Sequence, residues 1–228
     1  MLFQGVLTKM QTELSAPINY YLTLGNDLVQ VHQLVCKKLK LKFMGYQCLS
    51  CGSDAVIFRQ GYCKSCFFEL PQTADWIMHP EKSKAHLGIE ERDLEYEKKV
   101  QLKPHIVYLA NSSNVKVGVT RKTQVPTRWI DQGAQAALEI LEVPNRYLAG
   151  IAEVALKNYV SDKTNWREML KGRAAETDLT VVRQKLISHL PQEVQPYVLN
   201  NKTPLNLKFP VEKYPENPKS LNLSKTPE

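Results

Sequence analysis

The chain has no run of apolar residues close to the length of about 18 that a membrane-spanning helix needs, so we expect no membrane span. It also has no internal repeat and no low-complexity tract. Its start, Met1–Lys9, lacks the basic and apolar segments of a secretory leader, which predicts a cytoplasmic protein. With 228 residues, of which 43% are hydrophobic, one or two domains with proper cores are expected.

Acidic residues are in the minority, with 23 Asp and Glu against 30 Lys and Arg, for a net charge of +7. An excess of basic residues favours a polyanion, such as nucleic acid, as the partner. Between Lys103 and Lys185 there are 13 basic and 8 acidic residues, so this segment carries a net charge of +5. A second basic stretch contains Lys37, Lys38, Lys40 and Lys42. The alternation of lysine and apolar residues predicts a strand over 38–43. The lysines of this strand could contact phosphate, or they could protect an exposed sheet edge from pairing with another strand, and the sequence leaves both interpretations open.

Cysteines are few, and four of the five occur in two close pairs, Cys48-Leu-Ser-Cys51 and Cys63-Lys-Ser-Cys66. Two such pairs, eleven residues apart, are the spacing of a four-cysteine zinc ribbon, and we expect structural Zn²⁺. Two disulfides are the alternative, but they need an oxidising compartment that the start of the chain does not predict.

Two smaller expectations accompany the zinc ribbon. The segment Ala55–Arg59 between the two cysteine pairs can form a small strand. The remaining cysteine, Cys36, is expected to be a small buried hydrophobic residue.

The regions outside the centre have simpler patterns. Asn19–Leu24 and Leu28–His32 predict a hairpin, and residues 1–46 as a whole predict a small β-barrel or sheet. Glu90–Lys99 is dense in charge, which indicates a linker or a short exposed helix. Seven of the 13 prolines follow residue 190, which predicts an extended tail. The expected domains are an N-terminal β-rich domain (1–46), a zinc ribbon (47–70), a linker (71–103), a central domain (104–190) and a Pro-rich tail (191–228).

The centre begins with two short alternating segments, His105–Ala110 and Val115–Thr120, which predict a β-hairpin. If the valines of both strands face the core, Tyr108 and Lys116 face outward beside Gly118. Because Gly118 has no Cβ, a substrate backbone could approach closely there.

Further elements follow the hairpin. The patterns predict a helix over Pro126–Gln132, a strand over Ala137–Val143, a helix from Asn145 to about Val160, and a helix from Asp178 to about Leu190. Arg128 lies in the first turn of the first helix, and Glu153 lies beside the apolar stripe of the second. Asn165 follows in a polar turn, Asp162–Asn165.

This order of residues resembles the GIY-YIG nuclease superfamily between Ile106 and Asn165. Ile106-Val107-Tyr108 is similar to the first signature and Lys116-Val117-Gly118 to the second, with Lys116 where many members have a tyrosine. Arg128, Glu153 and Asn165 match by order and type. The resemblance implies a three-stranded sheet flanked by helices, nucleic acid as the partner, and phosphodiester cleavage. Lys116 leaves one supposed catalytic hydroxyl absent.

The residue types suit phosphodiester cleavage independently of the family resemblance. Glu153 could hold Mg²⁺ or Mn²⁺, which prefer carboxylate and water ligands. Tyr108 could orient or deprotonate the attacking water, and Arg128 offers a two-pronged contact to phosphate. The residues expected to contact nucleic acid are Lys116, Gly118, Arg121 and Asn165. Each residue alone also fits an ordinary structural role.

Over nearly its full length the chain resembles an uncharacterised bacterial family of unknown function. The residues that carry this resemblance are Phe3-Gln4-Gly5, the ribbon with Gly61-Tyr62-Cys63, Val107–Ser113, Lys116–Arg121, Pro126–Gly133 and Thr164–Arg167. The resemblance implies an architecture without an established activity. Members of that family continue past the point where this chain stops, which leaves open the alternative that this chain is truncated at its C-terminus.

We therefore expect an α+β protein with an N-terminal β-rich domain, a four-cysteine zinc ribbon and a GIY-YIG-like domain. The expected function is nucleic-acid binding, with divalent-metal-dependent endonuclease activity as a candidate. A catalytically degenerate RNA or DNA binder and a protein-interaction module are the alternatives.

Overall fold

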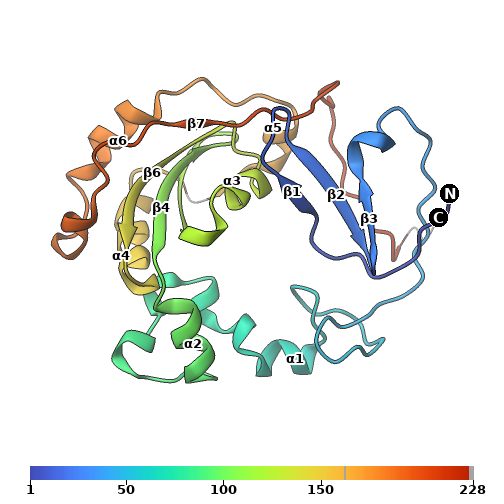
Figure 1. Ribbon diagram of the computed structural model, residues 1–228, viewed down its shortest axis with the longest axis horizontal. Coiled ribbons are helices and arrows are strands. Elements are labelled where there is room, and N and C mark those ends of the chain that lie inside the picture. The colour runs from blue at the N-terminus through green and yellow to red at the C-terminus, as the bar shows by residue number, and fades with distance from the viewer. Residues whose placement is uncertain (162, 226–228) are drawn as a thin grey trace.

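The computed structural model describes residues 1–161 and 163–225, and these form two antiparallel sheets, of which the second is flanked by helices (Figure 1). Asp162 of the predicted polar turn and the last three residues of the predicted tail lie outside this range. No helix within it is long and apolar enough to cross a membrane. The mixed α+β class predicted from the sequence is confirmed.

The bounds of the elements are as follows. The strands are β1 (Gln11–Glu13), β2 (Asn19–Leu24), β3 (Asp27–Gln30), β4 (His105–Asn111), β5 (Val115–Arg121), β6 (Ala136–Val143) and β7 (Leu205–Asn206). The α-helices are α1 (Lys64–Glu69), α2 (Leu94–Gln101), α3 (Thr127–Asp131), α4 (Arg146–Lys157), α5 (Trp166–Leu170) and α6 (Leu179–Ile187). The 3-10 helices are η1 (Val31–Leu34), η2 (Pro71–Thr73), η3 (Asp75–Ile77), η4 (Pro80–Lys82), η5 (Ala85–Leu87), η6 (Lys122–Gln124) and η7 (Gln192–Tyr197).

The first sheet has the order β1-β2-β3, and the predicted hairpin over β2 and β3 is confirmed. Gly25 makes the turn with a φ of +59°, a conformation that glycine adopts without strain. The strand predicted over 38–43 is wrong, because this segment has neither helix nor strand. Its apolar residues Leu39 and Leu41 are each 52% exposed, so the alternation has no core to face.

The second sheet has the order β5-β4-β6-β7. Its predicted hairpin, β4–β5, is confirmed, and β6 pairs antiparallel with the other edge of β4. The prediction of a three-stranded sheet is wrong, because a short segment of the Pro-rich tail adds a fourth strand, β7. It pairs with β6 through Ala136–Asn206 and Ala137–Leu205.

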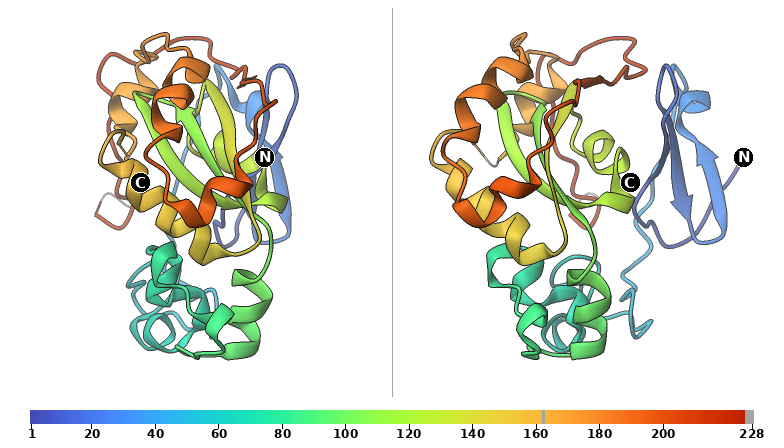
Figure 2. Two further views of the ribbon diagram at one scale, coloured as in Figure 1. Left: turned by 90° about the vertical axis from the view of Figure 1, so that its left-hand side faces the viewer. Right: turned by 60° about the vertical axis from the view of Figure 1, so that its left-hand side comes forward.

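Both faces of this sheet are covered, and Figure 2 shows helices on each side of it. On one face, Val107 and Leu109 pack with residues of α4 and α6. On the other, Ile106 and Tyr108 pack with α3. The expectation that Tyr108 and Lys116 face outward is therefore wrong: Tyr108 is fully buried and Lys116 is 4% exposed.

The N-terminal and C-terminal segments meet beside α3. Ile18 is buried in the same cluster as Tyr108 and Leu207, and its N–H donates to the carbonyl of Lys208 at 2.9 Å. Lys9 adds an ion pair to Asp131 of α3 at 2.6 Å. The first sheet is thus attached to the second by the start and the end of the chain together.

The helices start where their caps predict. The Asn145 side chain accepts the Leu148 N–H at 2.9 Å at the start of α4, and Asp178 accepts the Thr180 N–H at 2.8 Å at the start of α6. Each such cap satisfies a backbone donor and contributes about 1 kcal/mol. Of the two alternatives for the charged segment Glu90–Lys99, the structure shows a helix, α2, which begins after Asp93; it is not wholly exposed, because Glu97 is buried.

Candidate metal centre and basic pocket

The four paired cysteines, which we call the cysteine cluster, come together at the start of α1. The sulfur atoms of Cys48, Cys51, Cys63 and Cys66 all lie within 4.8 Å of one another. The Cys51 and Cys63 sulfurs are 3.9 Å apart. Zinc–sulfur bonds of about 2.3 Å in a tetrahedron put neighbouring sulfurs about 3.8 Å apart. The cysteine cluster could therefore hold a zinc ion with little change, and its four thiols would supply a closed structural site.

The backbone around the cysteine cluster favours thiolates. The N–H of Cys63 donates to the Cys48 sulfur at 3.3 Å, and this bond is the main reason why the pKa of Cys48 falls to about 6. The pKa of Cys51 is also lowered, chiefly by the Ser53 side chain. The pKa of Cys66 rises instead, to about 12, because its hydrogen bond with Cys63 keeps it protonated. A bound cation would remove this competition between neighbouring sulfurs.

Two expectations near the cysteine cluster are wrong. Cys36 is exposed with a φ of +61°, so it is not a buried hydrophobic residue. Ala55–Arg59 forms no strand, and the pairing that the described residues show there is an isolated bridge between Arg59 and Tyr62. The chain between the cysteine pairs is therefore held mainly by turns.

A second site lies where β5, α3 and α4 meet. A pocket of about 200 Å³ is lined by Lys116, Arg128, Arg146, Glu153 and Lys157, and we call it the basic pocket. Among the described residues that line it, four are basic and one is acidic. It brings together five of the residues singled out in the sequence, namely Tyr108, Lys116, Gly118, Arg128 and Glu153. Their roles stay predictions.

Tyr108 forms the floor of the basic pocket. Its hydroxyl donates to Gln132 Oε1 at 2.9 Å and also interacts with the Arg128 side chain. Burial raises the pKa of Tyr108, and the nearby Arg128 offsets this only in part. The phenol therefore remains protonated at neutral pH and can donate a hydrogen bond.

Gly118 faces Tyr108 in the β4–β5 register. A Cβ on residue 118 would lie 2.7 Å from the Tyr108 hydroxyl oxygen. The space that glycine leaves is thus used by the tyrosine of the same chain. This corrects the expectation that a substrate backbone approaches Gly118.

Arg146 is the cation of the basic pocket that is held by backbone carbonyls. Its guanidinium donates to the carbonyls of Trp76 at 3.1 Å and of Ile77 at 2.7 Å. Burial lowers its pKa to about 10, and the charge of Glu153 opposes that shift. Arg146 remains charged at neutral pH, so a half-buried positive charge lines the pocket. The segment that it holds also forms a wall of the pocket, through Met78 and Pro80.

Glu153 is buried on α4, and its Oε2 lies 3.6 Å from the Lys157 ammonium. Lys116 reaches from β5 and donates to Thr164 Oγ1 at 2.5 Å. Lys157 is one turn after Glu153 and Arg146 is two turns before it, so all three share a face of α4.

The other two predicted nucleic-acid contacts lie outside the described lining of the basic pocket. Arg121 ends β5, and its Nε donates to Gln124 Oε1 at 3.4 Å. Asn165 caps α5, a helix that the sequence did not predict, by accepting the Glu168 N–H at 3.3 Å. Asn165 therefore has a structural role, in addition to any contact with a ligand.

The sequence did not single out Gln132, Arg146, Lys157 or the wall that contains Met78, all of which line the basic pocket. Helical spacing could have found three of them. Gln132 follows Arg128 by four positions, and Arg146 and Lys157 lie on the Glu153 face of α4. Met78 is far away in the sequence and carried no local signal.

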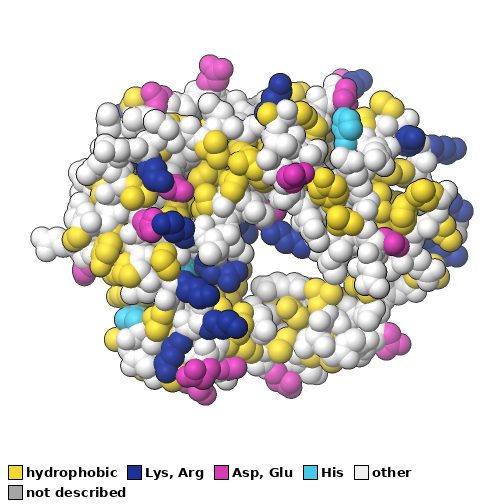
Figure 3. All heavy atoms as spheres, viewed as in Figure 1, with side chains coloured by type: hydrophobic (Ala, Val, Ile, Leu, Met, Phe, Trp, Pro, Cys, Tyr) yellow, Lys and Arg dark blue, Asp and Glu magenta, His cyan; other side chains and the backbone are white. Residues whose placement is uncertain are grey.

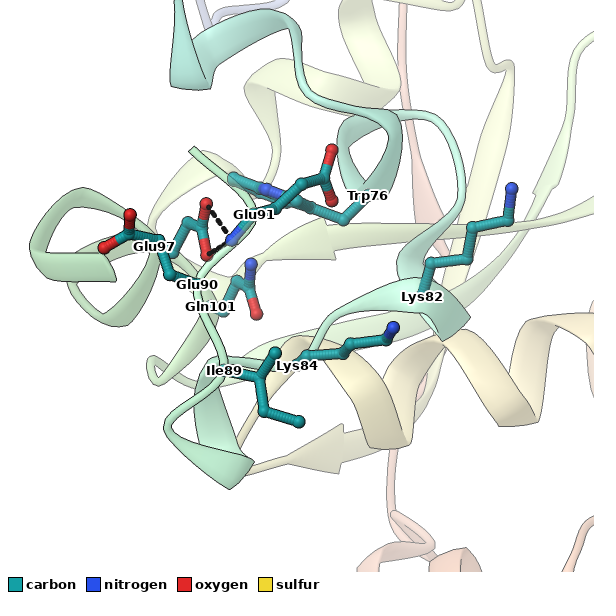
Figure 4. A pocket seen from close by; sticks show the side chains of 8 residues that line it. All are labelled: Trp76, Lys82, Lys84, Ile89, Glu90, Glu91, Glu97 and Gln101. Carbon is teal, nitrogen blue, oxygen red and sulfur yellow. Dashed lines mark hydrogen bonds between the residues drawn. The ribbon is translucent and has the colours of Figure 1, made fainter. Parts of the chain in front are cut away.

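A smaller pocket of about 90 Å³ lies beside α2 (Figure 4). The buried Glu97 carboxylate accepts the backbone N–H groups of Glu91 and Arg92, at distances down to 2.8 Å. Trp76 and Gln101 also line it, and both are almost fully buried. The carbonyl of Trp76 accepts from the Arg146 guanidinium, so this residue lies between the smaller pocket and the basic pocket.

Comparison with known proteins places the chain in a family. The family described as "Protein of unknown function (DUF2797)" matches residues 36–228. The chain belongs to this family. The part that matches DUF2797 includes both the cysteine cluster and the basic pocket, and it begins after β3. Neither the curated proteins nor the solved structures gave a match.

Proposed function

We propose that the basic pocket binds a phosphate group of nucleic acid. The observation that carries this proposal is the gathering of Arg128, Arg146, Lys116 and Lys157 around one small cavity with a single carboxylate, Glu153, in the described lining. Arginine donates to phosphate oxygens in pairs, and a buried charge attracts an anion more strongly than an exposed one.

The size of the basic pocket favours a phosphate over a larger ligand. Its volume of about 200 Å³ lies below the range of about 300–1,000 Å³ that encloses drug-sized molecules. The excess of basic residues over 103–185 extends the attraction beyond the cavity. Figure 3 shows Lys and Arg side chains gathered near an opening in the molecule, on the side where Figure 1 places β4 and α2.

Phosphodiester hydrolysis is the second candidate, because Glu153 lines the same cavity as Tyr108 and Arg128. The order of these residues resembles that of GIY-YIG nucleases, which supports this candidate. Glu153 is a carboxylate that would hold Mg²⁺ or Mn²⁺, and such a cation, when bound, lowers the pKa of a coordinated water and neutralises charge.

In that reaction each residue has a task set by its surroundings. Arg128 binds a phosphate oxygen. The Tyr108 hydroxyl would turn its one hydrogen from Gln132 to a reacting oxygen, and because burial raises its pKa it orients that oxygen rather than acting as a base. Lys157, whose ammonium lies 3.6 Å from the Glu153 carboxylate, supplies a further positive charge beside the phosphate.

The cysteine cluster completes the proposal as a structural zinc site. Its four sulfurs leave no open ligand position, so zinc would stabilise the fold near α1 rather than take part in hydrolysis.

Fluorescence anisotropy with labelled oligonucleotides tests the proposal. Neutralising about four to six phosphates predicts a slope of about −4 to −5 for log affinity against log salt on duplex. Arg128→Gln should reduce the steepness by about one unit, whereas Lys219→Gln in the exposed C-terminal segment should leave it nearly unchanged. An affinity that does not depend on salt would instead favour a protein-interaction module.

A further inference from the structure

The cations of the basic pocket differ in how far they are buried. Lys116 on β5 is 4% exposed and is the least exposed of them. Arg146 and Lys157 on α4 are half-buried, and Arg128 on α3 is exposed. A ligand that pairs with all four must therefore reach from the surface down to Lys116.

The segment before α2 forms one wall of the basic pocket through Met78 and Pro80. Two bonds from Arg146 to backbone carbonyls hold the start of this segment. Its next turn touches α4 so closely that a Cβ on Gly150 would overlap the backbone nitrogen of Glu81. A strand that crossed the pocket would meet this wall, whereas a group that ends in the pocket has no need to pass it.

The charge of the basic pocket exceeds what one internal phosphate offsets. Its described lining carries four positive charges and one negative charge, a net +3. An internal phosphodiester has one negative charge and two oxygens that are not bonded to sugar. A terminal phosphomonoester has close to two negative charges at pH 7 and three such oxygens. The monoester therefore offsets more of the positive charge and offers one more acceptor.

The donors of the basic pocket favour three oxygens as well. Arg146 uses Nε and one of its two Nη groups for backbone carbonyls, so the other Nη group remains for a ligand. Arg128 offers a two-pronged donor at the exposed side of the pocket. Together with the Lys116 ammonium, these groups can approach a phosphate from three directions, and only a monoester has a free oxygen for each.

We propose that the basic pocket binds the terminal phosphomonoester at the end of a nucleic-acid strand, with its three free oxygens toward Lys116, Arg128 and Arg146. This inference rests on the proposed function and narrows the bound phosphate to a strand end. The cavity of about 200 Å³ holds the phosphate, and the nucleotide that carries it lies outside, beside the exposed Met78.

The expected gain in affinity follows from the additional charged oxygen. One hydrogen bond between charged groups corresponds to about 10- to 150-fold in affinity. A strand with a terminal phosphate should therefore bind at least about 10-fold more tightly than the same strand with a terminal hydroxyl. Diffuse attraction alone predicts a smaller change, because one charge is added to a strand that already carries many.

Fluorescence anisotropy with three single-stranded 12-mers of one sequence tests this proposal, without added divalent cations so that no strand is cut. Each is labelled at its 3′ end, and the 5′ ends carry a hydroxyl, a phosphate, or a phosphate blocked by a methyl ester. The methyl ester removes one free oxygen and the second charge. Only the phosphate should bind at least about 10-fold more tightly than the hydroxyl.

A 12-mer with a 3′-phosphate and a 5′ label covers the other end of the strand. A gain of this size at either end supports the proposal and gives the polarity of the bound strand. No gain at either end, or an equal gain from the methyl ester, overturns it.

Variants place the effect in the basic pocket. Lys116→Gln should remove most of the gain from the terminal phosphate and should change the affinity for the hydroxyl-ended strand less. Lys219→Gln, in the exposed C-terminal segment, is the control and should retain the gain. The melting temperature shows whether Lys116→Gln is folded. If it is not, Arg128→Gln takes its place, because that side chain is exposed, and a gain that survives unchanged there overturns the proposal.

A mononucleotide or free phosphate offers the same chemistry as a strand end, and competition separates these sources. Adenosine 5′-monophosphate and inorganic phosphate are titrated against the bound 12-mer with a terminal phosphate. Displacement only at concentrations far above the Kd of that 12-mer supports a strand end. Displacement by either small molecule at concentrations equal to that Kd would show a mononucleotide or phosphate site and would overturn the proposal.

Failure of end binding can be told apart from failure of the basic pocket. If all 12-mers bind equally and Arg128→Gln weakens each of them, end binding is refuted and the phosphate site stands. If neither 12-mers nor duplex bind at low salt, the proposed function fails, and this inference fails with it.

Discussion

The hydroxyl of Tyr108 lies beside Gly118 on the neighbouring strand, 2.7 Å from the position that a Cβ of residue 118 would take. The tyrosine and the glycine therefore form one unit across β4 and β5. The missing side chain lets the phenol lie over the sheet and reach Gln132 at 2.9 Å.

Replacing Gly118 by alanine should push the Tyr108 ring away from β5. Overpacking of this kind costs about 1–3 kcal/mol, so chemical denaturation should show a lower free energy of unfolding by that amount. The same change in a Tyr108→Leu background should cost less, because the ring that the new Cβ would meet is gone. Equal costs in both backgrounds would show that the two residues are not coupled.

The cysteine cluster should hold one zinc ion per chain. Cys63→Ser should remove it, because the substitution takes away one of the four sulfur ligands and a serine hydroxyl does not replace a thiolate on zinc. Without the metal, residues 48–66 lose their main source of order, so protease should cut there first. Cys36→Ser is the matched control and should retain zinc by elemental analysis. Purified protein that contains disulfides and no zinc would contradict the assignment.

If the basic pocket hydrolyses phosphodiesters, Glu153→Gln should abolish nicking of supercoiled and single-stranded substrates with Mg²⁺ or Mn²⁺. Binding should stay equal or become tighter, because a negative charge near the phosphate is lost. Tyr108→Phe should lower the rate by about 10²–10⁴ if its hydroxyl takes part in the reaction. Glu95→Gln on the exposed side of α2 is the control.

Equal cutting by unchanged protein and Glu153→Gln would indicate a contaminant or another site. If neither protein cuts any substrate while both bind, the chain is a nucleic-acid binder without hydrolysis.

Stability should fall in mild acid because of His105. Burial lowers its pKa to about 4 from the ordinary value of 6.5, and Nδ1 lies 2.7 Å from the Lys103 carbonyl oxygen. The unfolded chain therefore takes up a proton at a higher pH than the folded one. The free energy of unfolding should be highest above pH 6.5 and decline between about 6.5 and 4, by up to about 3 kcal/mol.

Urea denaturation across this range measures the effect, with His105→Gln expected to flatten the decline. His86→Gln, at an exposed histidine that stacks on Tyr147, should leave the decline as it is. An unfolding free energy of the unchanged protein that is constant between about pH 4 and 6.5 would refute the assignment.

Much of the central sheet could be predicted because its signals are local. Alternation marks β4, β5 and β6, and the caps Asn145 and Asp178 mark the starts of α4 and α6. The strand predicted over 38–43 does not form, and this has a physical reason. Alternation describes which side chains share a face, but it does not say whether a core exists for that face to cover.

The candidate site was predicted in part for the same reason. Periodicity separates Tyr108 from Val107 on β4, but only the fold shows that α3 covers the Tyr108 face. The cysteine cluster follows directly from its spacing. The wall of the basic pocket at Met78 depends on the distant contact of Arg146 with Trp76 and Ile77, which no local pattern encodes.

The bond from the Ile18 N–H to the Lys208 carbonyl has a consequence for synthesis on the ribosome. The first sheet emerges early, but its backbone partner Lys208 is synthesised much later. Ile18, together with the neighbouring face of β4, must therefore remain without its final packing until residues 207 and 208 have left the exit tunnel. A nascent chain arrested before residue 200 should expose this apolar surface to chaperones, and the same chain released from the ribosome with residues 207 and 208 present should not.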